Sequence, residues 1–132
     1  MLIKLKKKNF SIKQKKKPNF SLGLAGEKKA VNFLLSKGFL ILETNLSIRN
    51  FEIDIIAIDQ LNNELVFFEV KTRKNDYSGR PSLAISKKKL KKITTVAQFY
   101  CEIKKLDYDY RFDAIEVIGD KIKHIENISW LN

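Results

Sequence analysis

Two short apolar runs in the middle of the chain predict a pair of neighbouring β-strands. Residues 51–58 and 65–71 are rich in β-branched and aromatic side chains, and neither run repeats with a helical period. The residues between them, 59–64, are polar and typical of turns. The two runs are therefore expected to fold back on one another as an antiparallel hairpin.

The position of the turn decides which side chains of this hairpin face one another. A turn centred on Leu61 and Asn62 gives three facing pairs, which are Asp59 with Glu64, Asp54 with Glu69, and Glu52 with Lys71. A turn on Asn62 and Asn63 instead shifts the partners by two residues. The acids still share a face, because side chains alternate along a strand. Either register therefore places Asp54 and Glu69 on one face of the sheet.

Apolar residues occupy both faces of the predicted hairpin. One face would hold Ile53, Ile55, Val66, Phe68 and Val70, and the acidic face would hold Ile56, Ile58, Leu65 and Phe67. Strands that are apolar on both faces are usually buried on both, so acids within them need a partner. Two facing carboxylates repel each other, and a divalent cation would remove that cost. The alternative is that they are ordinary charges on a solvated strand face, partly paired with Lys71.

The remaining pattern predicts one helix before the hairpin, and a helix and two strands after it. The predicted elements are a helix from Ser21 to about Lys37, a strand at 39–43, the hairpin strands, a polar loop at 72–82, a helix from Ser86 to about Lys104, and strands at 110–118 and 121–125. Ser21 would cap the first helix and Gly38 would end it. The order α-β-β-β-α-β-β predicts an α/β domain.

The first predicted helix places a carboxylate on the face that packs against the sheet. Gly23, Glu27, Ala30 and Leu34 follow helical spacing and share that face. Glu27 could therefore reach the hairpin acids. The alternative for Glu27 is an acid in the first helical turn, favoured by the helix dipole.

The basic charge of the chain is concentrated at its start. The net charge is +11, and residues 1–17 contain eight lysines and no acid, which leaves +3 for the rest. We expect residues 1–17 to be a disordered tail and residues 18–132 to form a single domain. Such a tail often binds polyanions. The alternative is a codon bias towards lysine, since lysine greatly outnumbers arginine.

The remaining composition excludes several classes of site. Cys101 is the single cysteine, which excludes an internal disulfide and a cysteine-based zinc site and suits a reducing cytoplasm. No run is long and apolar enough to cross a membrane, and no secretory signal is expected. The single histidine, His124, excludes a histidine pair or triad and is expected at the surface. We therefore expect a cytoplasmic protein with no membrane partner.

The element order and a set of local motifs resemble the restriction-endonuclease-like fold with its PD-(D/E)xK motif, and more closely the YraN-like family of small bacterial proteins. The resemblance covers about residues 23–125. Its motifs are Gly23-Leu-Ala-Gly26-Glu27-Lys-Lys-Ala30, Asn45, Glu52-Ile53-Asp54-Ile55-Ile56, Val66-Phe67-Phe68-Glu69-Val70-Lys71-Thr72-Arg73, Lys89, and Arg111-Phe112-Asp113. The resemblance implies a mixed central sheet flanked by helices.

The resemblance also implies roles for individual residues. Asp54 and Glu69 would bind Mg²⁺ or Mn²⁺, and Glu27 from the first helix would be a further ligand or would orient metal-bound water. Lys71 would position the attacking water or stabilise charge on the phosphate. Glu52 and Arg73 would lie behind the site or face the phosphate. Phe51 stands where the family usually has glycine, and it could close the space that a nucleic-acid backbone would use.

These observations predict a metal-dependent endonuclease that acts on DNA, including branched or structured DNA as Holliday-junction resolvases do. The residues expected to contact DNA are Arg73, Arg80, Lys87, Lys88, Lys89, Lys91 and Lys92. The lysines could also be a solvated helix face. Resolvase-like relatives act as dimers, so the resemblance allows a homodimer. The alternatives are a nucleic-acid-binding protein of the same fold without catalysis, which Phe51 motivates, and a small protein–protein adaptor.

Overall fold

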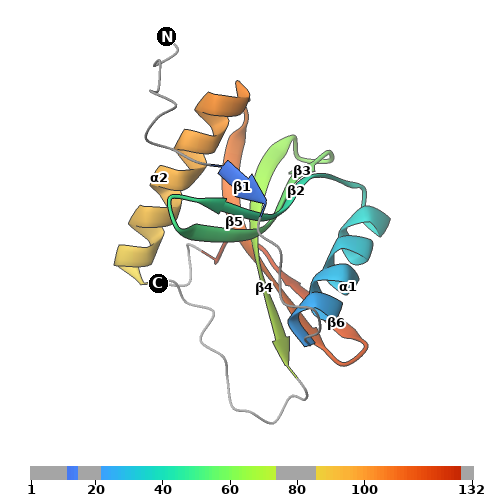
Figure 1. Ribbon diagram of the computed structural model, residues 1–132. Coiled ribbons are helices and arrows are strands. Elements are labelled where there is room, and N and C mark those ends of the chain that lie inside the picture. Colours follow the sequence, from blue (N-terminus) through green and yellow to red (C-terminus); the bar gives the residue numbers. More distant parts are fainter. Residues whose placement is uncertain (1–11, 15–21, 74–85, 129–132) are drawn as a thin grey trace.

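The computed structural model describes residues 12–14, 22–73 and 86–128. The described elements are β1 (Ile12–Gln14), α1 (Leu22–Ser36), β2 (Phe39–Ile48), β3 (Phe51–Asp59), β4 (Glu64–Arg73), α2 (Lys87–Lys104), β5 (Asp109–Ile118) and β6 (Lys121–Ile125). Figure 1 shows one sheet with α1 and α2 on opposite sides of it. This arrangement confirms the predicted α/β fold with a mixed sheet flanked by helices.

The strands of the sheet follow their order in the chain, from β1 to β6. Every neighbouring pair is antiparallel except β4 and β5, which are parallel. Parallel neighbours need a crossover connection, and α2 lies in the segment that supplies it. β1 was not expected, because it falls within the lysine-rich stretch 1–17. β2 and β4 are each longer than predicted, and β4 runs on to Arg73 instead of ending at Lys71.

The hairpin of β3 and β4 has the first of the two predicted registers. Asp59 pairs with Glu64 and Ile55 pairs with Phe68. The Asp59 carboxylate closes the turn, because its Oδ1 accepts hydrogen bonds from the backbone N–H groups of Leu61 and Asn62 at 3.1 and 3.2 Å. An aspartate that bonds the backbone of the next residues fixes a turn locally. The turn therefore sets the register along the whole hairpin.

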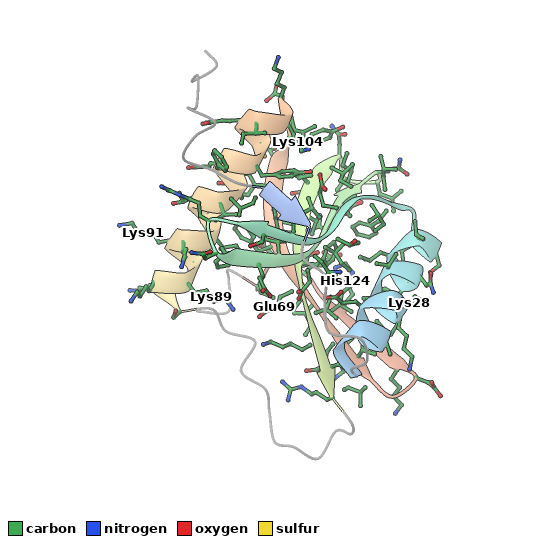
Figure 2. All side chains as sticks on the ribbon, in the orientation of Figure 1. Lys28, Glu69, Lys89, Lys91, Lys104 and His124 are labelled. Atoms are coloured by element: carbon green, nitrogen blue, oxygen red, sulfur yellow. The ribbon has the colours of Figure 1, made fainter. Side chains whose placement is uncertain are left out.

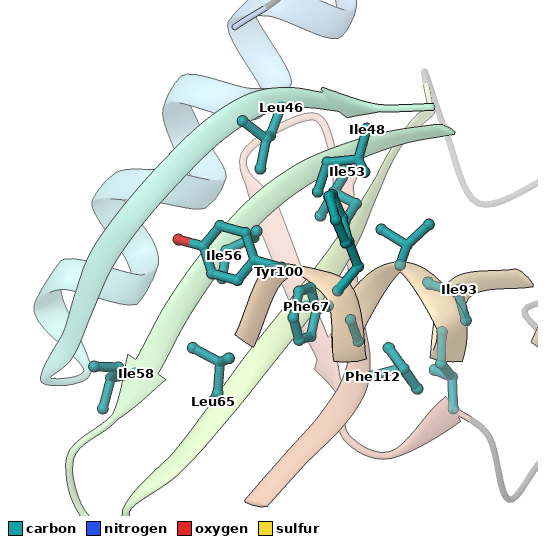
Figure 3. Packing of buried hydrophobic residues seen from close by; sticks show 14 of the residues in the cluster. Leu46, Ile48, Ile53, Ile56, Ile58, Leu65, Phe67, Ile93, Tyr100 and Phe112 are labelled. Atoms are coloured by element: carbon teal, nitrogen blue, oxygen red, sulfur yellow. The ribbon is translucent and has the colours of Figure 1, made fainter. Parts of the chain in front are cut away.

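Two apolar clusters hold the helices on the two faces of the sheet. The cluster on the α1 side includes Ala30, Leu34, Phe39, Ile55, Ala57, Val66, Phe68, Ile115 and Val117. The cluster on the α2 side, seen in Figure 3, includes Leu46, Ile53, Ile56, Ile58, Leu65, Phe67, Ile93, Tyr100 and Phe112. Burial of apolar area on both faces is the main term that stabilises such a sheet.

Ile53 corrects the predicted assignment of faces. It was expected beside Ile55, but it packs in the α2-side cluster while Ile55 packs on the α1 side. In the ladder of β2 and β3, Thr44 pairs with Ile55 and Leu46 pairs with Ile53. Asn45, which lies between them in β2, is not paired in the ladder and has a φ of +52°. A residue with positive φ interrupts the regular alternation of a strand. Side-chain parity therefore changes at Asn45, next to the predicted site.

The two helices are positioned by specific local features. Ser86 caps α2, since its Oγ accepts a hydrogen bond from the Lys89 N–H at 3.1 Å. Gly38 follows α1 with a φ of +88°, as expected for a helix stop. Within α1, Gly26 lies so close to β4 that an added Cβ would overlap with Thr72 Oγ1. Neither α1 nor α2, the helices of the described residues, is apolar enough to cross a membrane.

A buried polar network ties β3, β4 and β5 together near the hairpin turn. Arg111 is its centre, with Nη1 at 3.0 Å from Asp59 Oδ2 and 2.8 Å from Glu64 Oε1, and Nε at 3.1 Å from both Asp113 oxygens. Asp113 is fully buried and its Oδ2 lies 2.7 Å from His124 Nε2. The prediction of a surface His124 is therefore wrong, because its ring lies among Phe33, Phe39 and Phe68.

Candidate active site

The candidate site begins where β3 and β4 separate. The last pair of their ladder is Ile55 with Phe68. Beyond this pair, β3 is hydrogen-bonded only to β2, and β4 only to β5. The next residue of β3 is Asp54, and the same register brings it opposite Glu69. Asp54 Oδ2 accepts a hydrogen bond of 2.7 Å from the backbone N–H of Val70. The Asp54 carboxylate is thereby fixed in the fork between the two strands.

Two lysines form ion pairs with the same carboxylate oxygen of Glu69. Its Oε1 lies 3.3 Å from Lys71 Nζ and 3.2 Å from Lys89 Nζ. Lys71 comes from the same strand, two residues on, whereas Lys89 comes from the first turn of α2. Figure 2 shows Lys89 and Glu69 close together at this end of α2. The fold thus brings together Asp54, Glu69 and Lys71, as predicted, and adds Lys89 as a direct contact of Glu69.

The two lysines control the charge of Glu69. Burial of this carboxylate acts to raise its pKa, but the positive charges of Lys89 and Lys71 and their hydrogen bonds outweigh burial. The pKa of Glu69 is therefore lowered below its ordinary value of 4.5. Glu69 is ionised at neutral pH and can act as an anionic ligand or as an acceptor of hydrogen bonds.

A cleft of about 180 Å³ opens beside these side chains. Its charged lining comes from four acids and one lysine, which are Glu52, Asp54, Glu69, Asp113 and Lys89. Its apolar lining includes Phe51, Ile53, Phe67, Ile93, Phe112 and Ile128, which belong to the α2 side of the sheet. The carboxylates therefore border a cleft with an apolar floor, and they do not stand on an open strand face.

Glu27 lies apart from this pair as a buried side chain of the second turn of α1, only 6% exposed. Within the described residues, no group of three Asp, Glu, His or Cys side chains could hold a metal ion. Asp54, Glu69 and Glu27 are thus not gathered into a three-carboxylate site. Two carboxylates still fit Mg²⁺, which is commonly bound through one or two carboxylates with waters and substrate phosphates.

Arg73 and Glu116 form an ion pair on the same part of the sheet. Arg73 Nε donates to Glu116 Oε2 at 3.2 Å, and Glu116 is only 4% exposed. Glu116 pairs with Lys71 in the parallel ladder of β4 and β5, so this acid stands next to the candidate site. Glu116 was not among the predicted site residues. Its signal was an acid between Ile115 and Val117 in an otherwise apolar strand.

The first two turns of α2 carry five exposed lysines, which are Lys87, Lys88, Lys89, Lys91 and Lys92. Of these, Lys89 contacts Glu69. Figure 2 shows Lys91 pointing away from the sheet. The Lys92 ammonium lies 5.9 Å from the ring centroid of Phe51, within cation–π range. Of the other predicted DNA contacts, Arg73 is the one paired with Glu116, and Arg80 lies outside the described residues.

Asn45 is a further polar residue at the fork. It stands across from Asp54, at the position that the ladder of β2 and β3 passes over. Its Oδ1 is buried and has no hydrogen-bond partner within the part of the chain that the structure describes. Such buried acceptors usually bond an ordered water or a ligand. Asn45 thereby adds a buried acceptor beside the fork.

Comparison with known proteins places the chain among bacterial relatives. The profile of the uncharacterised protein family UPF0102 matches residues 26–117. A UPF0102 protein of Thermodesulfovibrio yellowstonii is 44% identical over 106 residues, which cover 80% of this chain and 93% of the relative. A UPF0102 protein of Clostridioides difficile is 46% identical over 112 residues, covering 83% and 96% of the two chains. The residues matched by the family profile include Asp54, Glu69, Lys71 and Lys89.

Proposed function

The chain belongs to the uncharacterised protein family UPF0102, and from the geometry of its site we propose that it is a metal-dependent endonuclease acting on DNA. One observation carries this proposal. Asp54 and Glu69 line one cleft at the fork of β3 and β4, and Lys71 and Lys89 both contact Glu69. Two carboxylates beside one cleft, with an adjacent lysine, are suited to phosphodiester cleavage.

Asp54, Glu69 and Lys71 would each have a separate role in the cleavage. Mg²⁺ or Mn²⁺ at the two carboxylates would supply Lewis-acid polarisation of the phosphate and a more acidic bound water. Asp54 is held by the Val70 N–H, so its remaining oxygen keeps a fixed direction. Lys71 is exposed, so its ammonium can reach a bound phosphate and stabilise the charge that develops there.

DNA is the substrate that the charge distribution favours. The exposed lysines of α2 lie on the helix that also supplies Lys89, and the chain begins with a further eight lysines in residues 1–17. Lys and Arg side chains bind phosphates without regard to base sequence. A four-way or flap junction is the more specific substrate that we propose, because a resolvase-like site would act on branched strands.

The test is a cleavage assay on four DNA substrates: linear duplex, single-stranded, flap and four-way DNA. Each substrate is incubated with Mg²⁺, Mn²⁺ or EDTA. We expect metal-dependent products with the wild-type protein and none with Asp54→Asn or Lys71→Met. Lys121→Met, at the start of β6, is the matched control and should cleave normally. Cleavage that persists in purified Asp54→Asn protein would overturn the proposal.

The second candidate is nucleic-acid binding without catalysis. It is favoured by the two lysines on Glu69 Oε1, because they already neutralise this carboxylate and lower the need for a cation. This function requires DNA binding that weakens as salt rises. It also requires that no metal in the same assay yields a product.

A further inference from the structure

The cleft beside Asp54 and Glu69 has dimensions and walls that the cleavage chemistry does not require. Its volume of about 180 Å³ is several times the share of one water molecule, about 30 Å³. It is smaller than the pockets that hold whole cofactors, which measure about 300–1,000 Å³. A cleft of this size fits one planar ring system. Its lining combines apolar side chains with the charged groups of Glu52, Asp54, Glu69, Asp113 and Lys89.

Phe51 gives this cleft an aromatic wall. The ring is half-buried at the start of β3 and packs against the α2-side cluster. It can still be approached from α2, because the exposed Lys92 places its ammonium 5.9 Å from the ring centroid. An aromatic side chain that is held by the core and approached by a cation is suited to stacking on a nucleobase.

Positive charge at the edge of the cleft complements a nucleotide. Lys89 lines the cleft, with its ammonium 3.2 Å from Glu69 Oε1. The Lys92 ammonium lies 5.9 Å from the ring centroid of Phe51. A nucleotide combines a flat ring with a phosphate, and these walls match both parts. A purely apolar partner would leave the lysines unused. A free anion would leave the apolar floor uncovered.

We propose that the cleft receives one unpaired nucleobase, which stacks on Phe51 while Lys89 and Lys92 contact the adjoining phosphates. This inference rests on the proposed action on DNA and names the form of DNA that the site recognises. A base inside a duplex is stacked and paired, and removing it costs a few kcal/mol. The protein should therefore prefer single-stranded or splayed DNA to a continuous duplex.

The experiment separates base stacking from general attraction to phosphate. Fluorescence anisotropy measures the affinity for a labelled single strand and for a duplex of equal length, in EDTA and at one salt concentration. The variants are Phe51→Leu, which removes the aromatic face, and Phe51→Tyr, which keeps it. Thermal unfolding shows that each variant is folded. A single strand with one abasic position in its middle serves as a further probe.

We expect the loss of the aromatic ring to weaken binding to unpaired DNA only. The wild-type protein should bind the single strand more tightly than the duplex. Phe51→Leu should lower the single-strand affinity about tenfold, within the range of base–aromatic stacking, and leave the duplex affinity unchanged. Phe51→Tyr should retain wild-type behaviour. The abasic position should weaken wild-type binding more than it weakens Phe51→Leu binding.

Two outcomes would overturn the inference. Equal affinities of the wild-type protein for single strand and duplex would do so, and so would equal losses on both DNAs with Phe51→Leu, since a purely structural role of Phe51 predicts equal losses. Neither result touches the cleavage proposal if metal-dependent products still form. Conversely, stacking without any product would leave this inference standing and overturn the nuclease.

Discussion

The backbone N–H of Val70 donates a 2.7 Å hydrogen bond to Oδ2 of Asp54, at the point where β3 and β4 part. At this position the Val70 N–H bonds to a side-chain oxygen and not to a backbone carbonyl of β3. The Asp54 carboxylate therefore has two tasks, since it closes the fork and takes part in the candidate site. Substitutions at this position should separate stability from activity.

Asp54→Ala should destabilise the protein more than Asp54→Asn does. Alanine leaves the Val70 N–H without its acceptor, and losing a hydrogen bond to a charged group costs about 1.5–3 kcal/mol. Asparagine keeps an oxygen acceptor at the same place. Urea unfolding gives the two free energies of unfolding, and both variants should lack cleavage. Equal unfolding free energies would show that the Val70 contact does not support the fork.

Lys89→Met should raise the pKa of Glu69 towards its ordinary value, because burial then acts against one lysine instead of two. A ¹³C titration of the Glu69 carboxyl measures this shift. Lys88→Met, an exposed neighbour on α2, is the matched control and should leave the titration unchanged. A Glu69 titration that does not move in Lys89→Met would contradict the contact.

Because the pKa of Glu69 is lowered by folding, this residue should make the protein less stable as the pH falls. The pKa of Glu69 is lower in the folded than in the unfolded protein, so its stabilisation is present above 4.5 and is lost as the pH falls through the folded pKa. Unfolding experiments between neutral pH and acid should therefore show a smaller loss in Lys89→Met than in the wild-type protein. An identical pH dependence would refute this expectation.

Gly26→Ala should destabilise the protein although alanine favours helices. The helical preference contributes about 1 kcal/mol, whereas overpacking costs about 1–3 kcal/mol, and the new Cβ would overlap with Thr72 Oγ1. The midpoint of thermal unfolding should fall. Combining Gly26→Ala with Thr72→Ala should recover part of the loss, because that oxygen is removed. Independent, additive effects of the two substitutions would argue against the close packing.

Arg111→Met should be among the most damaging single substitutions. It would leave Asp59, Asp113 and Glu64 together without their shared guanidinium. Breaking a buried ion pair by removing one partner costs about 3–5 kcal/mol. Lys121→Met, an exposed residue at the start of β6, should change stability by less than about 0.5 kcal/mol. Similar unfolding free energies for the two variants would exclude a stabilising role of the network.

The hairpin was predictable because its determinants are local. The turn residues and the strand alternation fixed the register of β3 and β4, and with it the approach of Asp54 to Glu69. The interruption at Asn45 was not predictable, because no turn or glycine signal in the sequence marks the positive φ of this residue. The face of Ile53 was misassigned for that reason.

Contacts between distant segments account for the rest of the site that sequence reasoning missed. Lys89 was expected to contact DNA, and its contact with Glu69 was not foreseen, because the crossover places the start of α2 beside β4. Glu116 escaped notice because a single acid in an apolar strand does not reveal its partner, Arg73. In each case the sequence showed a charge in an unusual setting, and only the fold identified the opposite charge.

The edges of the described sheet limit how two copies of the protein could assemble. One edge is β1, of only three residues, and the other is β6, in which Lys121 and Lys123 are exposed. Short strands and lysines at an edge discourage the addition of a further strand. Two β6 edges side by side would bring like charges together. Pairing of two copies through these strand edges is therefore disfavoured, and two copies that share one branched DNA would meet through other surfaces.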